Sequence, residues 1–218
     1  MPQPLVILGG AGSGAIVAEA VRAAGDSGPY TLIGFLNDMA TPETTFAGKP
    51  VLGPFAAWRD CPADAVFIGA FPKVKQALAR HRRLTALEIP DDRWATVFHP
   101  GAYVAKDVIV GPGSFVGAGA VIEPGLAGSR HVCIRGGSYI SHDVRLGEFV
   151  FVGPNATILG RCTIDEGSHI AANAVCREET RVGRYALVGI GAVVVADAPD
   201  FAILVGNPAR IIGRLNPD

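Results

Sequence analysis

The second half of the chain carries a branched aliphatic residue at almost every sixth position. From Val104 to Val194, sixteen positions are spaced by six residues, and Val, Ile or Leu occupies fourteen of them. The two exceptions are Gly128 and Cys176. A fixed short period maintained over this length indicates a solenoid of stacked identical units. A step of six residues is typical of a β-helix, because helical repeats need about twenty residues or more.

The remaining positions of each hexad fit one short strand followed by one corner. Small side chains dominate four residues after the aliphatic position: Ser114, Ala120, Ser138, Ala156, Cys162, Ser168, Ala174, Ala186 and Ala192. Turn-forming residues often stand three residues after it: Gly113, Gly119, Gly125, Gly137, Asp143, Asn155, Gly167, Asn173 and Gly191. These residues tolerate the left-handed backbone of a tight bend. Three hexads would close one triangular coil of 18 residues, and the coils would stack about 4.8 Å apart by strand pairing.

The first part of the chain has a different pattern, in which apolar and helical runs alternate. Short strands are expected at Leu5–Leu8, Thr31–Leu36 and Ala65–Ile68, with helices over Ala15–Ala24 and Lys73–Arg83. This alternation predicts a small parallel βαβ sheet. The predicted fold is therefore a Rossmann-like α/β domain over residues 1–97 and a parallel β-helix over residues 98–218. A C-terminal apolar segment, 201–205, is expected to cover the edge of the last coil.

A glycine-rich turn lies between the first predicted strand and the first predicted helix. Backbone N–H groups in such a turn can approach a diphosphate, and a helix N-terminus favours an anion. The spacing is not the full G-x-G-x-x-G fingerprint, so a plain tight turn stays an alternative. Asp38, after the second strand, either touches a ribose or base or is a solvated loop acid. The candidate substrate-binding residues are Gly10, Gly12, Ser13, Gly14, Asn37, Asp38, Gly69 and Ala70.

The combination of this front domain with hexad repeats resembles a known family, the bacterial nucleotide-aminosugar N-acetyltransferases of the PglD/NeuD type. These are hexapeptide-repeat acyltransferases of glycan and O-antigen biosynthesis, and the resemblance covers essentially the whole chain. The motifs that carry it are Leu5-Val6-Ile7-Leu8-Gly9-Gly10-Ala11-Gly12-Ser13-Gly14, Gly34-Phe35-Leu36-Asn37-Asp38, Phe67-Ile68-Gly69, His99-Pro100, Ser141-His142-Asp143 and Gly206-Asn207-Pro208-Ala209-Arg210.

The resemblance implies a left-handed β-helix, a homotrimer, and acetyl-CoA bound between the β-helices of adjacent subunits. It also implies that the front domain binds a nucleotide-linked amino sugar. Two positions depart from the family pattern, because Ser13 and Phe151 stand where members often carry histidine. These departures leave the acceptor sugar open. His169 lies one 18-residue coil after Phe151, on the same edge of the predicted helix.

His142 and Asp143 form the candidate catalytic pair at a predicted corner. The resemblance implies that His142 is the general base for acetyl transfer to an amine, oriented by the adjacent carboxylate of Asp143. An exposed corner histidine beside a turn-forming Asp is the alternative on local sequence alone. Gly160 lies 18 residues after His142. Its N–H is a candidate oxyanion donor, and an ordinary corner glycine is the alternative.

Cofactor-binding candidates lie in the last coils and the tail. In relatives the phosphates of acetyl-CoA sit in this region, although each basic side chain here could equally be a solvated charge. The candidates are Gly160, at the thioester, and Arg177, Arg181, Arg184 and Arg210, at the phosphates.

Composition narrows the function classes further. A net charge of −1 gives no indication of nucleic-acid binding. The four cysteines have no C-x-x-C spacing, and no signal peptide or membrane-spanning segment is evident, so a reduced cytoplasmic chain without membrane insertion is expected. No metal site is expected, since His131, His142 and His169 are not spaced for zinc. Sialic-acid-type O-acetylation and a non-catalytic β-helix scaffold that binds nucleotide sugar remain the alternative functions.

Overall fold

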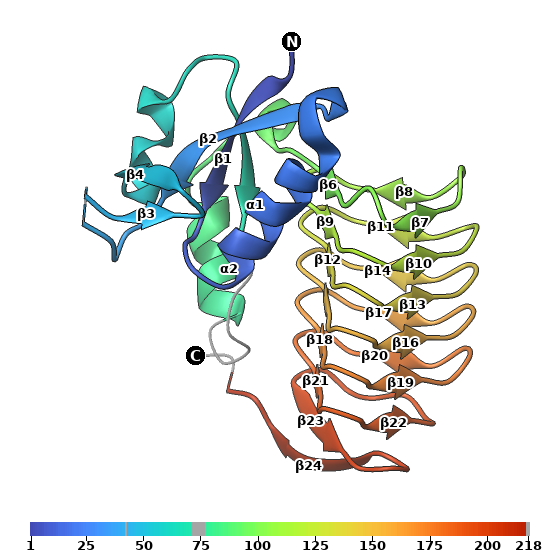
Figure 1. The fold of residues 1–218 in the computed structure, drawn as a ribbon. Coiled ribbons are helices and arrows are strands. Elements are labelled where there is room, and N and C mark those ends of the chain that lie inside the picture. The colour runs from blue at the N-terminus through green and yellow to red at the C-terminus, as the bar shows by residue number, and fades with distance from the viewer. Residues whose placement is uncertain (42, 71–76, 217–218) are drawn as a thin grey trace.

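The computed structural model describes residues 1–41, 43–70 and 77–216 (Figure 1). The N-terminal portion contains a five-stranded sheet in the order β3-β4-β2-β1-β5. Strands β1, β2, β4 and β5 are parallel, and β3 pairs antiparallel with β4. The strands are β1 (Gln3–Leu8), β2 (Tyr30–Leu36), β3 (Thr45–Phe46), β4 (Lys49–Gly53) and β5 (Val66–Gly69).

Among the described residues, two α-helices and three short 3-10 helices lie between or after these strands. The α-helices are α1 (Ser13–Ala24) and α2 (Ala77–Thr85), and the 3-10 helices are η1 (Gly25–Ser27), η2 (Phe55–Asp60) and η4 (Asp91–Arg93). Helix α1 begins two residues earlier than predicted, so Ser13 is its first residue and Gly12 its N-cap. The predicted helix Lys73–Arg83 starts within residues 71–76, which lie outside the described part. The sequence did not indicate β3 and β4, because each is short and β4 contains a proline.

The second half of the chain forms three parallel sheets that make up the faces of a solenoid (Figure 1). The β7 face contains β7 (Tyr103–Val104), β10 (Val121–Ile122), β13 (Tyr139–Ile140), β16 (Thr157–Ile158), β19 (Val175–Cys176) and β22 (Val193–Val194). The β8 face contains β8 (Ile109–Val110), β11 (Ala127–Gly128), β14 (Arg145–Leu146), β17 (Thr163–Ile164) and β20 (Arg181–Val182).

The β9 face contains β6 (Val97–Phe98), β9 (Phe115–Val116), β12 (Cys133–Ile134), β15 (Phe151–Val152), β18 (His169–Ile170), β21 (Leu187–Val188), β23 (Ala202–Val205) and β24 (Arg210–Arg214). Strand β23 pairs with β21, and β24 then pairs antiparallel with β23. The segment 202–205 therefore covers the edge of the last coil, as predicted.

The parallel β-helix predicted from the hexads is confirmed, with the left-handed winding that the family resemblance implied. Each aliphatic position is the second residue of a two-residue strand, and paired strands are one 18-residue coil apart, as in Val121↔Tyr139. Except in the first coil, where Val104 and Val110 are only half-buried, these positions form the solenoid core. All nine predicted turn formers have positive φ, as do His131 and Phe149 at equivalent corners.

The α/β portion packs on the β9 face near the start of the solenoid (Figure 1). In this face the first residue of each strand points outward. Phe115 and Cys133 are nevertheless fully buried, because they join one apolar cluster with Ile7 and Val17. The two parts of the chain therefore share a continuous core at this junction.

Aromatic stacking attaches helix α2 to a solenoid corner. The ring of His81 stacks on Phe149 at 3.8 Å, and Phe149 stacks on His131 at 4.5 Å. His81 Nδ1 lies 2.6 Å from the Tyr185 hydroxyl, which donates to Glu166 at 2.8 Å. These contacts fix α2 relative to the β-helix.

Candidate active site

His142 lies at the corner that joins β13 of the β7 face to β14 of the β8 face. Asp143 adopts the left-handed conformation with φ 58°, which turns the chain here. The Asp143 Oδ2 atom lies 2.9 Å from His142 Nδ1. The imidazole is 47% exposed and the carboxylate 64% exposed, so this pair faces solvent. A carboxylate on Nδ1 leaves Nε2 available for proton transfer, which is the arrangement that a general base needs.

Gly160 lies one coil further on, directly against the imidazole. A Cβ atom at Gly160 would stand 2.7 Å from His142 Nε2 and 2.8 Å from Cε1. Only glycine therefore admits the observed ring position. Within the described residues, the Gly160 N–H has no hydrogen-bond acceptor. His142 and Gly160 lie side by side because one coil is 18 residues long. Both distances support the proximity that the sequence predicted.

A second carboxylate beside this corner was not predicted from the sequence. Glu123, one coil before Ser141, accepts hydrogen bonds from the Tyr139 hydroxyl at 2.5 Å and the Ser141 hydroxyl at 2.9 Å. These bonds, the one from Tyr139 first, lower the pKa of the Glu123 carboxyl, and a bond from the His142 backbone adds to the effect. The coil spacing that links His142 to Gly160 also places Glu123 beside Ser141, although it does not indicate these hydrogen bonds.

A separate cavity of about 450 Å³ lies at the carboxyl ends of β1 and β2 in the α/β portion. Its lining residues are Gly9, Gly10, Asn37, Asp38, Met39, Phe55, Ala79 and Arg83. The position matches the crevice where ligands bind in parallel α/β sheets. Three of the eight predicted substrate-binding residues, Gly10, Asn37 and Asp38, thus lie together at one cavity.

Asp38 is held by two partners rather than pointing freely into the cavity. Its Oδ1 accepts the backbone N–H of Phe55 at 2.8 Å, and its Oδ2 lies 2.5 Å from Arg83. Arg83, on α2, was not predicted as a site residue. Its guanidinium is 58% exposed, so a cationic group is available at the rim.

The other five predicted substrate-binding residues do not line this cavity. Gly12 caps α1 with φ 77° and has open space around it, and Ser13 begins the helix. The remaining three have packing roles. A Cβ at Gly14 would lie 3.2 Å from Phe35, and Ala70 fills the space beside Gly9. Gly69, on β5, faces Leu84 of α2.

Glycine at position 9 is required by a close backbone approach. Its φ is 154°, and an added Cβ would stand 2.3 Å from the Ala70 Cβ. The Asn37 side chain donates to the Gly9 carbonyl at 2.8 Å. The end of β1 is thus held between the ends of β2 and β5. This close packing sets the shape of the cavity.

The predicted CoA arginines differ in their surroundings. Arg181 pairs with Asp165 at 2.6 Å, and Arg184 pairs with Asp200 at 3.1 Å. Arg177 and Arg210 have no ion-pair partner in the described ranges. They are the arginines most readily available to a phosphate.

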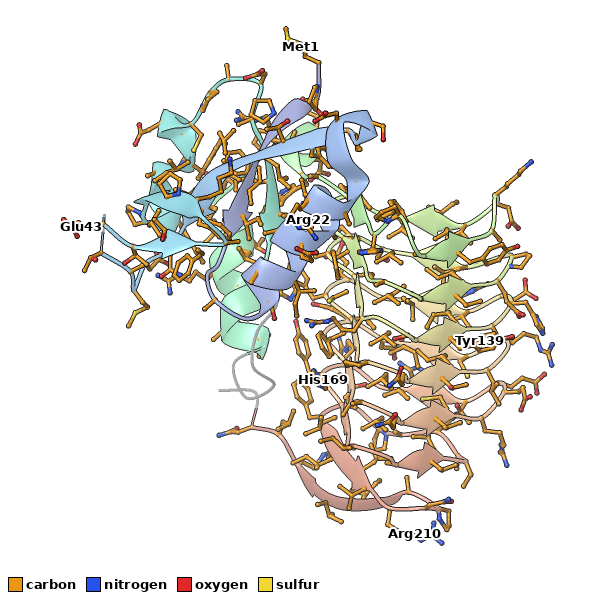
Figure 2. All side chains as sticks on the ribbon, viewed as in Figure 1. Met1, Arg22, Glu43, Tyr139, His169 and Arg210 are labelled. Atoms are coloured by element: carbon orange, nitrogen blue, oxygen red, sulfur yellow. The ribbon has the colours of Figure 1, made fainter. Side chains whose placement is uncertain are left out.

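Phe151 and His169 do not lie at the His142 corner. Their rings stack at 4.3 Å on the β9 face, the face that carries the α/β portion (Figure 2). Burial lowers the pKa of His169 to about 4, so the ring is neutral at pH 7. His169 thus continues the aromatic surface of Phe151 as a neutral ring.

The described residues form neither a metal-ligand cluster nor a membrane-spanning helix. In the ranges that the structure covers, no three His, Cys, Asp or Glu side chains are grouped to hold a metal ion. None of the helices in these ranges is long and apolar enough to cross a membrane.

Comparisons with known proteins bear on the whole chain. The family described as bacterial transferase hexapeptide (six repeats) matches residues 143–178. A search of curated protein sequences finds no match. The acetyltransferase domain of PglB from Neisseria gonorrhoeae, solved in complex with acetyl coenzyme A, is similar with a TM-score of 0.85. Its sequence identity is 30%, over 97% of this chain and 100% of that chain.

Two further solved structures show the same likeness. PerB from Caulobacter crescentus, in complex with CoA and GDP-perosamine, gives a TM-score of 0.83 at 26% identity, covering 96% of this chain and 97% of its own. WeeI from Acinetobacter baumannii gives a TM-score of 0.83 at 25% identity, covering 95% and 99%. Similarity thus extends over both the α/β portion and the solenoid. The protein belongs to the hexapeptide-repeat sugar N-acetyltransferases of the PglD/NeuD type.

Proposed function

We propose that this protein transfers an acetyl group from acetyl-CoA to the amine of a nucleotide-linked 4-amino-4,6-dideoxy sugar. The observation that carries the proposal is His142, with Asp143 on Nδ1 and the Gly160 backbone against Nε2. The relatives support the two substrates, since one was solved with acetyl-CoA and another with CoA and GDP-perosamine.

His142 acts as general base in this proposal. The neutral amine attacks the thioester carbonyl carbon, and Nε2 accepts a proton from the amine as the C–N bond forms. The tetrahedral intermediate then collapses, the C–S bond breaks, and the CoA sulfur leaves as the thiol with the proton returned by His142. Asp143 keeps the ring oriented and stabilises the imidazolium. A positioned base of this kind contributes roughly 10²–10⁴-fold to the rate.

Gly160 supplies the oxyanion donor in the same proposal. The thioester oxygen gains negative charge in the intermediate and needs a fixed donor close to the base. The Gly160 N–H is free of intramolecular acceptors in the described part of the chain and is one coil from His142. Beyond it, toward the last coils, Arg177 and Arg210 are the favoured contacts for the CoA phosphates, with Arg181 and Arg184 in supporting positions.

The α/β portion, residues 1–97, acts as a Rossmann-like nucleotide-binding domain in this account, and residues 98–218 form the catalytic β-helix domain. A cavity of about 450 Å³ is of the size that small ligands occupy. The N–H groups of Gly10 and the α1 N-terminus favour the diphosphate. Arg83 adds a positive charge, held by Asp38 until the phosphates compete for it.

The two halves of the site lie on different sides of one chain. The cavity belongs to the portion that covers the β9 face, whereas His142 is at the corner opposite that face (Figure 1). A sugar held in the cavity therefore meets a His142 from a neighbouring copy, in the homotrimer that the family resemblance implies.

The test measures free-thiol release from acetyl-CoA with UDP-, GDP- and dTDP-linked 4-amino-4,6-dideoxy sugars. Mass spectrometry of the product identifies the acetylated atom. The proposal predicts turnover with one of these amines and none with the matched 4-hydroxy sugars. Transfer to a hydroxyl would instead establish an O-acetyltransferase. Binding of nucleotide sugar without binding of CoA would establish the scaffold alternative.

A further inference from the structure

We propose that Glu123 is a positioning residue for His142, a fixed anion that holds the catalytic corner by binding the two hydroxyls next to it. This inference rests on the proposed role of His142 as general base. Glu123 lies directly after β10, one coil before Ser141, and accepts a hydrogen bond from Tyr139, which Figure 2 shows on the side of the solenoid away from the α/β portion. It touches neither the cavity nor the helix α2.

Two hydroxyl donors next to the corner converge on the Glu123 carboxylate. The Tyr139 hydroxyl donates to Oε1 at 2.5 Å, and the Ser141 hydroxyl donates to Oε2 at 2.9 Å. An ionised carboxylate accepts at both oxygens and carries no proton of its own, so it matches both donors. A glutamine at this position would present an NH₂ group to one of the hydroxyls.

The repeat itself does not require a carboxylate at this position. The equivalent residues in the other coils are Ala105, Ser141, Leu159, Arg177 and Val195. These coils form the same corner without an acidic residue there. Glu123 therefore serves something specific to the coil of His142 rather than the corner geometry common to the solenoid.

The carboxylate is charged at neutral pH. Hydrogen bonds from Tyr139 and then Ser141 hold the pKa of Glu123 below its usual range. The anion is therefore held at both oxygens by hydroxyls from strand β13 and from Ser141, the residue directly before His142.

Other charges near the corner do not replace Glu123. The charged residues at the equivalent corners of the other coils are Lys106, Asp107, Arg161, Arg177, Glu178, Glu179 and Asp197. Arg161 and Glu179 pair with each other at 2.9 Å, and the Asp107 carboxylate accepts the Gly125 N–H at 3.0 Å. Within the described residues, Glu123 is the carboxylate that accepts hydrogen bonds from both the Tyr139 and the Ser141 hydroxyls beside His142.

The test compares wild-type enzyme with Glu123→Gln and Tyr139→Phe, using Glu19→Gln, at an exposed position of helix α1, as the matched control. The Gln variant keeps the size of the side chain and removes its charge. We expect kcat to fall about 10- to 100-fold in Glu123→Gln, as for a misplaced catalytic group, with KM for acetyl-CoA changed less than about threefold. The kcat of Tyr139→Phe should fall less, and the kcat of Glu19→Gln should match that of wild type.

Two readouts separate positioning from a general loss of structure. The melting temperature of Glu123→Gln should match that of wild type, because the carboxylate contacts two hydroxyls at the surface of the solenoid. The ¹³C chemical shifts of labelled His142, which need no turnover, should differ between Glu123→Gln and wild type, because the corner is no longer held. Unmoved chemical shifts together with wild-type kcat would refute the proposal for Glu123. If His142→Asn retains wild-type turnover, the base assignment fails instead, so the two failures are distinguishable.

Discussion

Substitution of Gly160 by alanine should displace the catalytic ring without unfolding the protein. The new Cβ would stand 2.7 Å from Nε2 and 2.8 Å from Cε1 of His142. Ordinary van der Waals contact begins near 3.4 Å, so the ring must retreat by about 0.7 Å. A displacement of this order in a catalytic group costs about 10²-fold in rate. The backbone at Gly160 has ordinary φ, and the half-exposed imidazole can swing into solvent, so stability should change little.

The assay is kcat/KM for thiol release, measured beside the melting temperature of each variant. Gly213→Ala is the matched control, because its new Cβ would meet one side-chain atom at 3.8 Å, an ordinary contact distance. We expect Gly160→Ala to lose about 10²-fold with an unchanged melting temperature, and Gly213→Ala to match wild type. If Gly160→Ala kept activity within about threefold, the position of His142 over Gly160 would not matter for catalysis, and the reasoning would be wrong.

Three other predictions concern the cavity, the core and the response to acid. Arg83→Ala should weaken nucleotide binding about tenfold or more by calorimetry with GDP and UDP, because a charged hydrogen bond is lost; an unchanged Kd would remove Arg83 from the site. Ile140→Ala empties a fully buried position, so it should cost about 2–5 kcal/mol in urea unfolding, and a cost below about 1 kcal/mol would contradict the packed solenoid core. Burial first, then Arg130, lowers the pKa of His131 from 6.5 to about 3. The unfolded chain therefore binds a proton that the folded chain excludes, and stability should fall as pH drops below 6.5, by at most about 1.4 kcal/mol per pH unit for this group. His131→Phe should flatten that pH dependence. Parallel curves of stability against pH for the variant and wild type would contradict its assignment to His131.

The solenoid could be predicted because its physical constraints act locally and repeat. Each inward position must be branched and apolar to fill a narrow prism, and each corner needs a residue that tolerates positive φ. These demands recur every six residues, so the period is visible in one sequence. The coil length then placed Gly160 against His142 correctly.

Contacts between distant segments could not be predicted in this way. His81 stacks on Phe149, and Arg83 reaches Asp38, only because α2 docks against both the solenoid and the sheet. No periodicity in the sequence encodes that docking. The glycine turn correctly predicted that another group approaches the backbone closely. It did not indicate which group, since Gly14 packs against Phe35 and not against a ligand.

Glu123 is an intermediate case. Its neighbour Ser141 is 18 residues away, so the coil rule that found Gly160 also applies to it. The rule was not sufficient, because it places residues side by side without indicating which of them bond. Convergence of the Tyr139 and Ser141 hydroxyls on one carboxylate is a property of the side chains, and it required the structure.

The proposed function depends on His142 as the base for acetyl transfer to a nucleotide-linked amine. The kcat of His142→Asn should therefore be compared with that of wild type, with acetyl-CoA and the amino sugar that the substrate panel identifies. We expect a loss of about 10²–10⁴-fold, with nucleotide-sugar binding retained. Activity within about threefold of wild type would contradict it.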